Sequence, residues 1–169
     1  ITVMGKGKYS GKAELTWSIK PMVSLADAVE GLDQNEFQAD DTVHTPKLVF
    51  KDGYNLVEGV DYELSGTKSA TDDGTYTITV TGKGQYAGTL PYDWTILPKI
   101  DIGDFIDGLD QTSFITDGAS HAPNIIWKDG GESLVKDVDY EISGITSGTT
   151  AGKYTITITG KGKYTGSYD

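Results

Sequence analysis

The chain has 169 residues, no cysteine, and 25 acidic against 14 basic side chains, which gives a formal net charge of -11. This charge opposes nucleic acid or an anionic membrane surface as a partner, and the lack of cysteine excludes disulfides, thiolate metal ligands and a thiol nucleophile. No run of about 18 apolar residues occurs, so the sequence predicts no membrane insertion.

A glycine-rich segment occurs three times, at spacings of 77 and 78 residues. Its copies are Gly5–Gly11, Gly82–Gly88 and Gly160–Gly166. A period this long corresponds to one small domain per copy and not to a solenoid repeat. The chain is therefore predicted to consist of the C-terminal strands of a preceding repeat (1–22), a complete repeat (23–99), and a repeat that lacks its last strand (100–169).

The first element of each repeat fits either a strand or a short helix. The residues with helical spacing are Leu25, Ala28, Val29 and Leu32, and in the next repeat Ile102, Phe105, Ile106 and Leu109. Ser24 or Asp101 could cap such a helix, and Gly31 or Gly108 could end it. However, two turns are short for a stable helix, and Val, Ile and Phe also favour strands. We expect a strand with at most one helical turn.

Alternation of apolar and polar residues predicts the later strands. In residues 23–99 these lie around Leu48 and Phe50, around Tyr62, at Tyr76–Thr81 and at Leu90–Ile96; in residues 100–169 they lie at Ile125–Trp127, around Tyr140 and at Tyr154–Thr159. Lys51–Gly53 and Lys128–Gly130 are predicted turns. The pattern predicts an all-β fold of tandem small antiparallel β-sandwiches of immunoglobulin-like type. The alternative is a small β-grasp unit with one short helix.

Three sequence blocks occur in the same order in both repeats: [FW]-K-D-G, then L-V-x-x-V-D-Y-E, then G-x-Y-T-I-T-[VI]-T-G-K-G-x-Y-x-G. The pattern resembles the bacterial immunoglobulin-like tandem repeats of large cell-surface and secreted proteins of Gram-positive gut bacteria. The resemblance implies an extracellular stalk or adhesin module.

We accordingly expect a non-catalytic extracellular stalk or spacer of a bacterial surface protein, with no cofactor. One alternative is an adhesin module that binds a host glycan or protein, with Tyr86 and Tyr164 in the glycine turns as its contacts. Another is an accessory domain of a secreted carbohydrate-active enzyme.

Other candidate residues have simpler interpretations. His44 and His121 lack a neighbouring nucleophile, so we expect strand-edge histidines and not catalytic ones. Asp137, Asp139 and Glu141 alternate along one strand, and because ligands from a flat strand diverge, a solvated acidic face is favoured over a calcium site. Trp17, Trp94 and Trp127 have the apolar parity of their strands and are predicted to lie in cores.

Residues 1–20 are expected to need a partner. Trp17 and Ile19 correspond to Trp94 and Ile96, and residues 100–169 offer no counterpart of this pair. We therefore expect residues 1–20 to complete the last repeat of another copy, head to tail, which is a contact that does not close. Neighbouring repeats of the same chain are the other expected partners.

Overall fold

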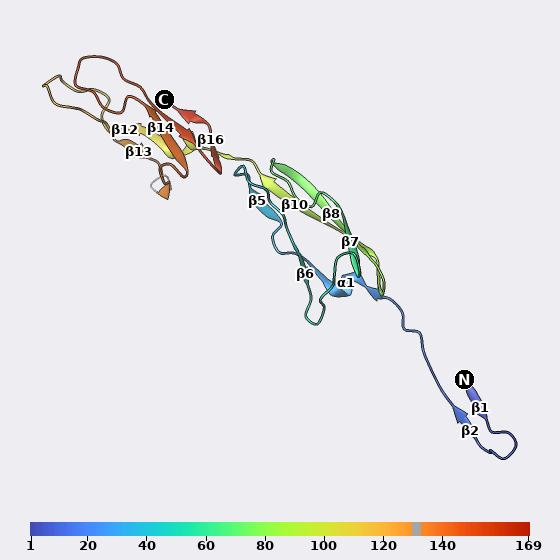
Figure 1. Ribbon diagram of the computed structural model, residues 1–169. Coiled ribbons are helices and arrows are strands. Elements are labelled where there is room, and N and C mark those ends of the chain that lie inside the picture. The colour runs from blue at the N-terminus through green and yellow to red at the C-terminus, as the bar shows by residue number, and fades with distance from the viewer. Residues whose placement is uncertain (130–132) are drawn as a thin grey trace.

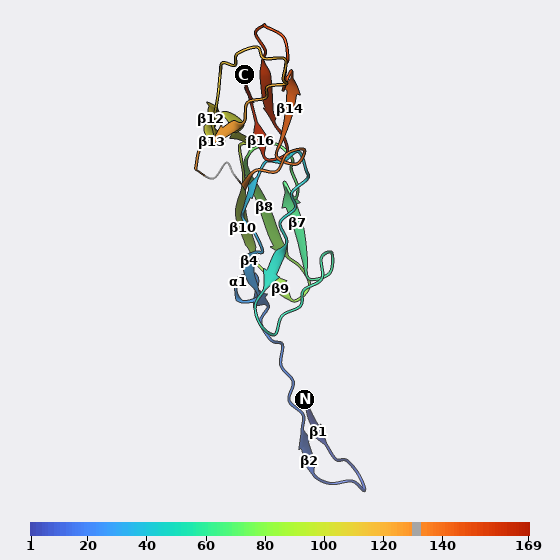
Figure 2. The same ribbon diagram turned by 90° about the vertical axis from the view of Figure 1, so that its left-hand side faces the viewer.

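The computed structural model describes residues 1–129 and 133–169, so Gly130 of the second predicted turn lies outside the described residues. The chain is an all-β protein, as predicted. An N-terminal hairpin and two separate units follow one another in a row (Figure 1), and a view from the side shows the same order (Figure 2). Within the described residues, no helix is long and apolar enough to span a bilayer.

The first unit has two layers. Its elements are β3 (Val23–Ser24), α1 (Leu25–Ala28), β4 (Val29–Leu32), β5 (Glu36–Gln38), β6 (Leu48–Phe50), β7 (Tyr62–Gly66), β8 (Gly74–Gly82), β9 (Tyr86–Ala87) and β10 (Thr89–Leu97). A four-stranded sheet of order β5-β10-β8-β7 forms one layer. The antiparallel pair β4–β6 and the turn α1 cover one of its faces, because their apolar side chains share a buried cluster with those of β7 and β8.

The ambiguous first element contains both kinds of structure. The Ser24 hydroxyl accepts a hydrogen bond from the Ala26 N–H at 3.3 Å, and this caps the single helical turn α1. The turn ends at Ala28 and not at Gly31, because the chain then becomes β4 and pairs with β6. The second unit has a 3₁₀ turn, η1 (Ile102–Phe105), at the same place. The expectation of a strand with at most one helical turn is confirmed.

Strands β8 and β10 form the longest strand pairing among the described residues. They are antiparallel from Gly74 opposite Ile96 to Thr81 opposite Thr89. The glycine turn between them sets this register, since the Gly82 N–H donates to the Gly88 carbonyl at 2.9 Å. Along β8 the tyrosine, isoleucine and valine are turned inward while the threonines alternate with them, as the period of two predicts.

The second unit repeats this arrangement only in part. Its elements are β11 (Ile100–Asp101), η1, β12 (Ile106–Leu109), β13 (Ile125–Trp127), β14 (Tyr140–Gly144), β15 (Ile156–Gly160), β16 (Tyr164–Thr165) and β17 (Ser167–Tyr168). The predicted strand at Tyr154–Thr159 begins only at Ile156, because β17 pairs with no residue of β15 before Ile158. The segment 113–115, which corresponds to β5, is not a strand.

Some strand pairs differ from the purely antiparallel sheets that the sequence predicts. The pairs β5–β10, β3–β9 and β11–β16 are parallel. The two strands of each parallel pair are distant in sequence, so no short turn forces them into a hairpin. The antiparallel pairs, in contrast, include the hairpin of β8 and β10 that the glycine turn closes.

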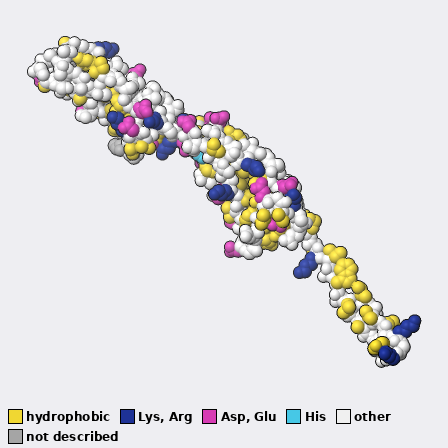
Figure 3. All heavy atoms as spheres, in the orientation of Figure 1, with side chains coloured by type: hydrophobic (Ala, Val, Ile, Leu, Met, Phe, Trp, Pro, Cys, Tyr) yellow, Lys and Arg dark blue, Asp and Glu magenta, His cyan; other side chains and the backbone are white. Residues whose placement is uncertain are grey.

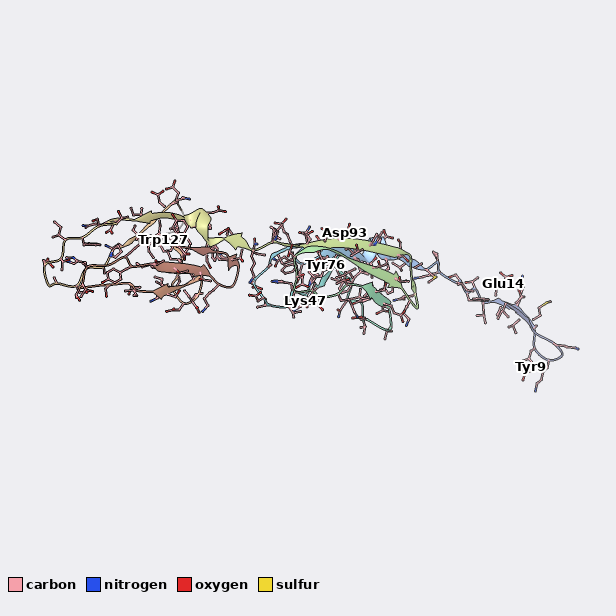
Figure 4. The ribbon with its side chains drawn as sticks, turned by 90° about the horizontal axis from the view of Figure 1, so that it is seen from above. Tyr9, Glu14, Lys47, Tyr76, Asp93 and Trp127 are labelled. Atoms are coloured by element: carbon pink, nitrogen blue, oxygen red, sulfur yellow. The ribbon has the colours of Figure 1, made fainter. Side chains whose placement is uncertain are left out.

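The N-terminal hairpin has the register of the β8–β10 hairpin without its unit. Strands β1 (Thr2–Met4) and β2 (Lys12–Glu14) pair with Thr2 opposite Glu14, just as Thr79 lies opposite Pro91 in β8 and β10. Figure 4 shows Tyr9 and Glu14 on this separate hairpin, away from Tyr76 and Asp93 of the first unit.

The three tryptophans differ in burial. Trp94 is 1% exposed and lies in a core, as predicted. Trp127 is half-buried against Tyr140, with ring centroids 5.1 Å apart. Trp17 is 72% exposed, so the prediction that it lies in a core is wrong within a single chain, because no second layer covers the extended segment that carries it.

Candidate functional site

The glycine turn of each unit docks onto its Val-Asp-Tyr-Glu segment. In the first unit the Lys83 N–H donates to the Asp61 carbonyl at 2.8 Å, and the Lys83 ammonium lies 2.6 Å from a Glu63 carboxylate oxygen. The Asp61 carboxylate also accepts from the Val57 N–H at 2.9 Å. The two most repetitive motifs of the sequence therefore hold each other in place.

The second unit reproduces these contacts residue for residue. The Lys161 N–H donates to the Asp139 carbonyl at 2.9 Å, and the Lys161 ammonium lies 2.6 Å from Glu141. The Asp139 carboxylate accepts from the Val135 N–H at 2.8 Å. Each of these carboxylates thus makes a local contact of its own. The part of the chain that the structure describes holds no group of three or more side chains that could together hold a metal ion.

The two tyrosines expected as ligand contacts are buried. Tyr86 is 8% exposed and Tyr164 is 7% exposed, and Tyr164 packs edge to face against Phe105 with ring centroids 5.5 Å apart. This corrects the expectation for both residues, because the docked turn folds each ring back onto its own unit. Tyr9, at the same position of the N-terminal hairpin, is 68% exposed.

Each unit contains an Asp-His pair four residues apart. His44 Nε2 lies 3.1 Å from a carboxylate oxygen of Asp40, and His121 Nε2 lies 2.9 Å from one of Asp117. Hydrogen bonds from Thr42, with a smaller contribution from His44, lower the pKa of Asp40. For Asp117 the N–H of Ala119 and then His121 have the same effect on the pKa.

The two histidines of these pairs lie at strand edges. The backbone of His44 bridges to Ala70 and that of His121 bridges to Gly148, each in an isolated antiparallel pair. Within residues 1–129 and 133–169, neither imidazole is hydrogen-bonded to a hydroxyl group that could act as a nucleophile. The same pair recurs at the same repeat position, as expected for a structural element.

The two units differ in how the apolar side chains beside the C-terminal half of β10, and those at the corresponding place in the second unit, are covered. In the first unit Trp94 and Ile96 of β10 are each 1% exposed. The indole N–H of Trp94 donates to the Thr67 carbonyl at 3.1 Å. Its ring lies edge to face with Phe37, with centroids 5.8 Å apart, and 4.9 Å from the ring of Tyr76.

The second unit has a groove of about 590 Å³ at this place, which we call the second-unit groove. Its lining includes Phe114, Ile145, Tyr154 and Ile156, the counterparts of Phe37, Thr67, Tyr76 and Ile78. Phe114 is 37% exposed, Tyr154 is 41% exposed and Ile145 is 54% exposed. The groove therefore presents the apolar surroundings that hold Trp94 in the first unit.

The second exposed apolar surface is the N-terminal arm, residues 1–22. Its exposed large side chains are Ile1, Val3, Met4, Tyr9, Leu15, Trp17, Ile19 and Met22. Figure 3 shows hydrophobic side chains along this arm and lysines at its tip. An apolar surface this continuous on a narrow arm is typical of a segment that another surface covers.

Comparison with known proteins gives no further information on the site, because no protein-family model, curated protein or solved structure matches the chain. The sequence interpretation did not identify Phe114 and Ile145 as groove residues. The signal was present, since the repeat spacing relates them to two residues that contact Trp94, but neither residue stands out without those contacts.

Proposed function

We propose that this chain is a non-catalytic tandem repeat that acts as an extracellular stalk or spacer of a bacterial surface protein. The observation that carries the proposal is the use of the same side chains for the same structural contacts in both units. The docked turns, the Asp-His pairs and the buried tyrosines all recur. A catalytic site, in contrast, needs one distinct set of groups in one place.

The row of units supports a spacer role. The buried clusters of the first unit draw on residues 23–96 and that of the second unit on residues 100–168, so each unit has its own core. The connection between them is short, and the Gln38 amide donates to the Pro98 carbonyl at its start. The Lys99 ammonium lies 2.5 Å from Asp41. These two contacts hold the start of the connection against the first unit.

The glycan-binding alternative has less support. Its expected contacts were Tyr86 and Tyr164, and both rings are turned into the cores. The extracellular location and the bacterial surface context rest on the resemblance of the repeated motifs, and so does the accessory-domain alternative.

The spacer role is tested by adding a repeat. In a variant with residues 23–99 duplicated in tandem, the maximum dimension from small-angle X-ray scattering should grow by about the length of one unit, because the units do not fold onto one another. Both chains should carry Trp17→Asp, so that self-association does not alter the result. An added unit that leaves the maximum dimension unchanged would contradict the proposal.

A further inference from the structure

We propose that the first unit binds a small amphipathic carboxylate in a cavity between its two layers. The apolar chain of the ligand lies between the layers, and its carboxylate lies beside Lys47 and Lys68. This cavity is called the inter-layer cavity below. The inference adds a ligand site to the first unit and does not depend on the proposed spacer role.

The inter-layer cavity has a volume of about 410 Å³. Sites for small ligands are typically about 300–1,000 Å³, with mostly apolar walls and a few polar groups. Leu32 of β4 and Leu48 of β6 form the wall on one layer, and Leu64 of β7 and Ile78 of β8 form the wall on the other. The cavity therefore has the size and the apolar walls that a short hydrocarbon chain requires.

The cavity lies where the core of the first unit is divided. One buried cluster contains Tyr62, another contains Ile78, and both of these residues line the cavity. Leu64 packs against both clusters and, like Leu32 and Leu48, is only half-buried. An apolar chain in the cavity would cover these three leucines, and removal of apolar surface from water favours its binding.

The charged groups of the cavity leave one positive charge unbalanced. The Lys68 ammonium lies 3.4 Å from a Glu58 carboxylate oxygen, whereas Lys47 makes no ion pair within the part of the chain that the structure describes. The Asp33 carboxylate accepts from the backbone N–H of Lys47 at 2.7 Å, which fixes the backbone that carries this lysine. Figure 4 shows Lys47 on the first unit. Two ammonium groups and one carboxylate favour a ligand with a single negative charge.

The second unit keeps the apolar positions of this cavity and changes the charged ones. The counterparts of its four apolar wall residues are Leu109, Ile125, Ile142 and Ile156.

The counterparts of Lys47, Lys68 and Glu58 are an asparagine, a threonine and a lysine, at positions 124, 146 and 136. The backbone at the third position is unchanged, since Glu58 bridges to Tyr62 as Lys136 bridges to Tyr140. The fold therefore needs the apolar walls but not the two lysines, and the anion site belongs to the first unit.

The first test measures whether octanoate stabilises the first unit. Urea unfolding is followed by the fluorescence of Trp94 in a chain whose other two tryptophans are replaced by phenylalanine. Octanoate, below the concentration at which it forms micelles, should raise the urea midpoint of the first unit as its concentration increases, because it binds the folded state only. Octan-1-ol should raise the midpoint less, and octylammonium should leave it unchanged. A chain that retains only Trp127 should show no shift for the second unit.

The second test gives the first unit the charged positions of the second. Lys47→Asn and Lys68→Thr should each weaken octanoate binding by about tenfold, because a charge-assisted hydrogen bond is lost. Glu58→Lys should strengthen it, because a negative charge is replaced by a positive one. The affinity for octan-1-ol should be the same in all three variants, which separates loss of the charge from a change in the cavity.

The third test blocks the cavity. Thr45 is exposed and lines the cavity, so Thr45→Phe should place a ring at its mouth and abolish octanoate binding. Val43→Phe is the matched control, because Val43 is exposed and does not line the cavity. Amide chemical shifts from NMR locate the ligand, and octanoate should shift the resonances of Leu32 and Leu64 in the unaltered chain and in Val43→Phe.

Three outcomes would overturn the proposal. One is an unfolding midpoint and a set of amide shifts that octanoate leaves unchanged. Another is equal stabilisation by octanoate, octan-1-ol and octylammonium, because the lysines would then recognise nothing. The third is octanoate binding that persists in Thr45→Phe with the affinity of Val43→Phe, because the ligand would then occupy another place.

Discussion

The same tyrosine occupies the glycine turn three times and has two different environments. Tyr86 and Tyr164 are buried, whereas Tyr9 is largely exposed, although the Gly5 N–H still donates to the Gly11 carbonyl as in the other turns. The turn itself is thus local, and the burial of its tyrosine depends on the segment against which the turn docks.

Removal of the tyrosine ring should therefore lower the free energy of unfolding only where the turn is docked and the ring is buried. Tyr86→Ala should lower the free energy of unfolding of the first unit by about 3–5 kcal/mol, because it removes a large core side chain. Tyr9→Ala, the same change at the same repeat position, should alter it by less than about 0.5 kcal/mol. Urea unfolding followed by tryptophan fluorescence measures both, and equal effects would contradict this explanation.

The acidic member of each Asp-His pair gives the stability a pH dependence. Hydrogen bonds from Thr42 lower the pKa of Asp40 below its ordinary value of 3.8 in the folded state. A lowered folded-state pKa stabilises the fold fully above the unfolded pKa, and this contribution is lost as pH falls through the folded pKa.

Asp40→Asn should consequently destabilise the first unit at pH 6 and have a smaller effect as pH falls below about 4. Asp117→Asn should do the same in the second unit, where the N–H of Ala119 is the main cause of the lowered pKa. Urea unfolding at a series of pH values measures the difference. A difference that grows toward low pH would have the wrong sign.

At the scale of elements, the turn of the β8–β10 hairpin is held by hydrogen bonds to the segment that leads into β7. The Asp61 residue makes two contacts, since its carboxylate holds the Val57 N–H and its carbonyl holds the Lys83 N–H of the turn. The nearby ion pair of Lys83 and Glu63 is exposed and solvent screens it.

These contacts should differ in their contribution. Asp61→Ala should lower the free energy of unfolding by about 1 kcal/mol, because the Val57 N–H loses its acceptor. Lys83→Ala should lower it by less than about 1 kcal/mol, because the ion pair lies at the surface. Asp139→Ala is the matched change in the second unit. Thermal unfolding monitored by circular dichroism checks the order, and a larger effect for Lys83→Ala would contradict it.

At the scale of the whole molecule, separate cores imply separate unfolding. Val80 is fully buried among residues of the first unit, and no buried cluster of the described residues contains side chains from both units. Trp94 reports on the first unit and Trp127 on the second.

Val80→Ala should therefore move the unfolding of the first unit to lower urea by an amount that corresponds to about 1–3 kcal/mol, and leave that of the second unit in place. Fluorescence of variants that retain only Trp94 or only Trp127 separates the two transitions. A shift of both transitions together would show that the units fold as one body.

The sequence by itself determined the repeat, the all-β class, the alternating faces of β8 and β10, and the cap at Ser24. These features depend on spacing along the chain, such as the period of two in Tyr76–Thr81 or a hydroxyl placed two residues before the N–H that it caps. A local pattern is sufficient for them because the interacting groups are close in sequence.

The tertiary structure alone decided the burial of Tyr86 and Tyr164, the exposure of Trp17, the parallel pairing of β5 with β10, and the lining of the second-unit groove. Each of these depends on segments that are tens of residues apart, and the same sequence motif is buried or exposed according to whether such a segment covers it. Tyr9 and Tyr86 have the same local sequence frame, and only the docking of Asp61 on one of the two turns makes them different.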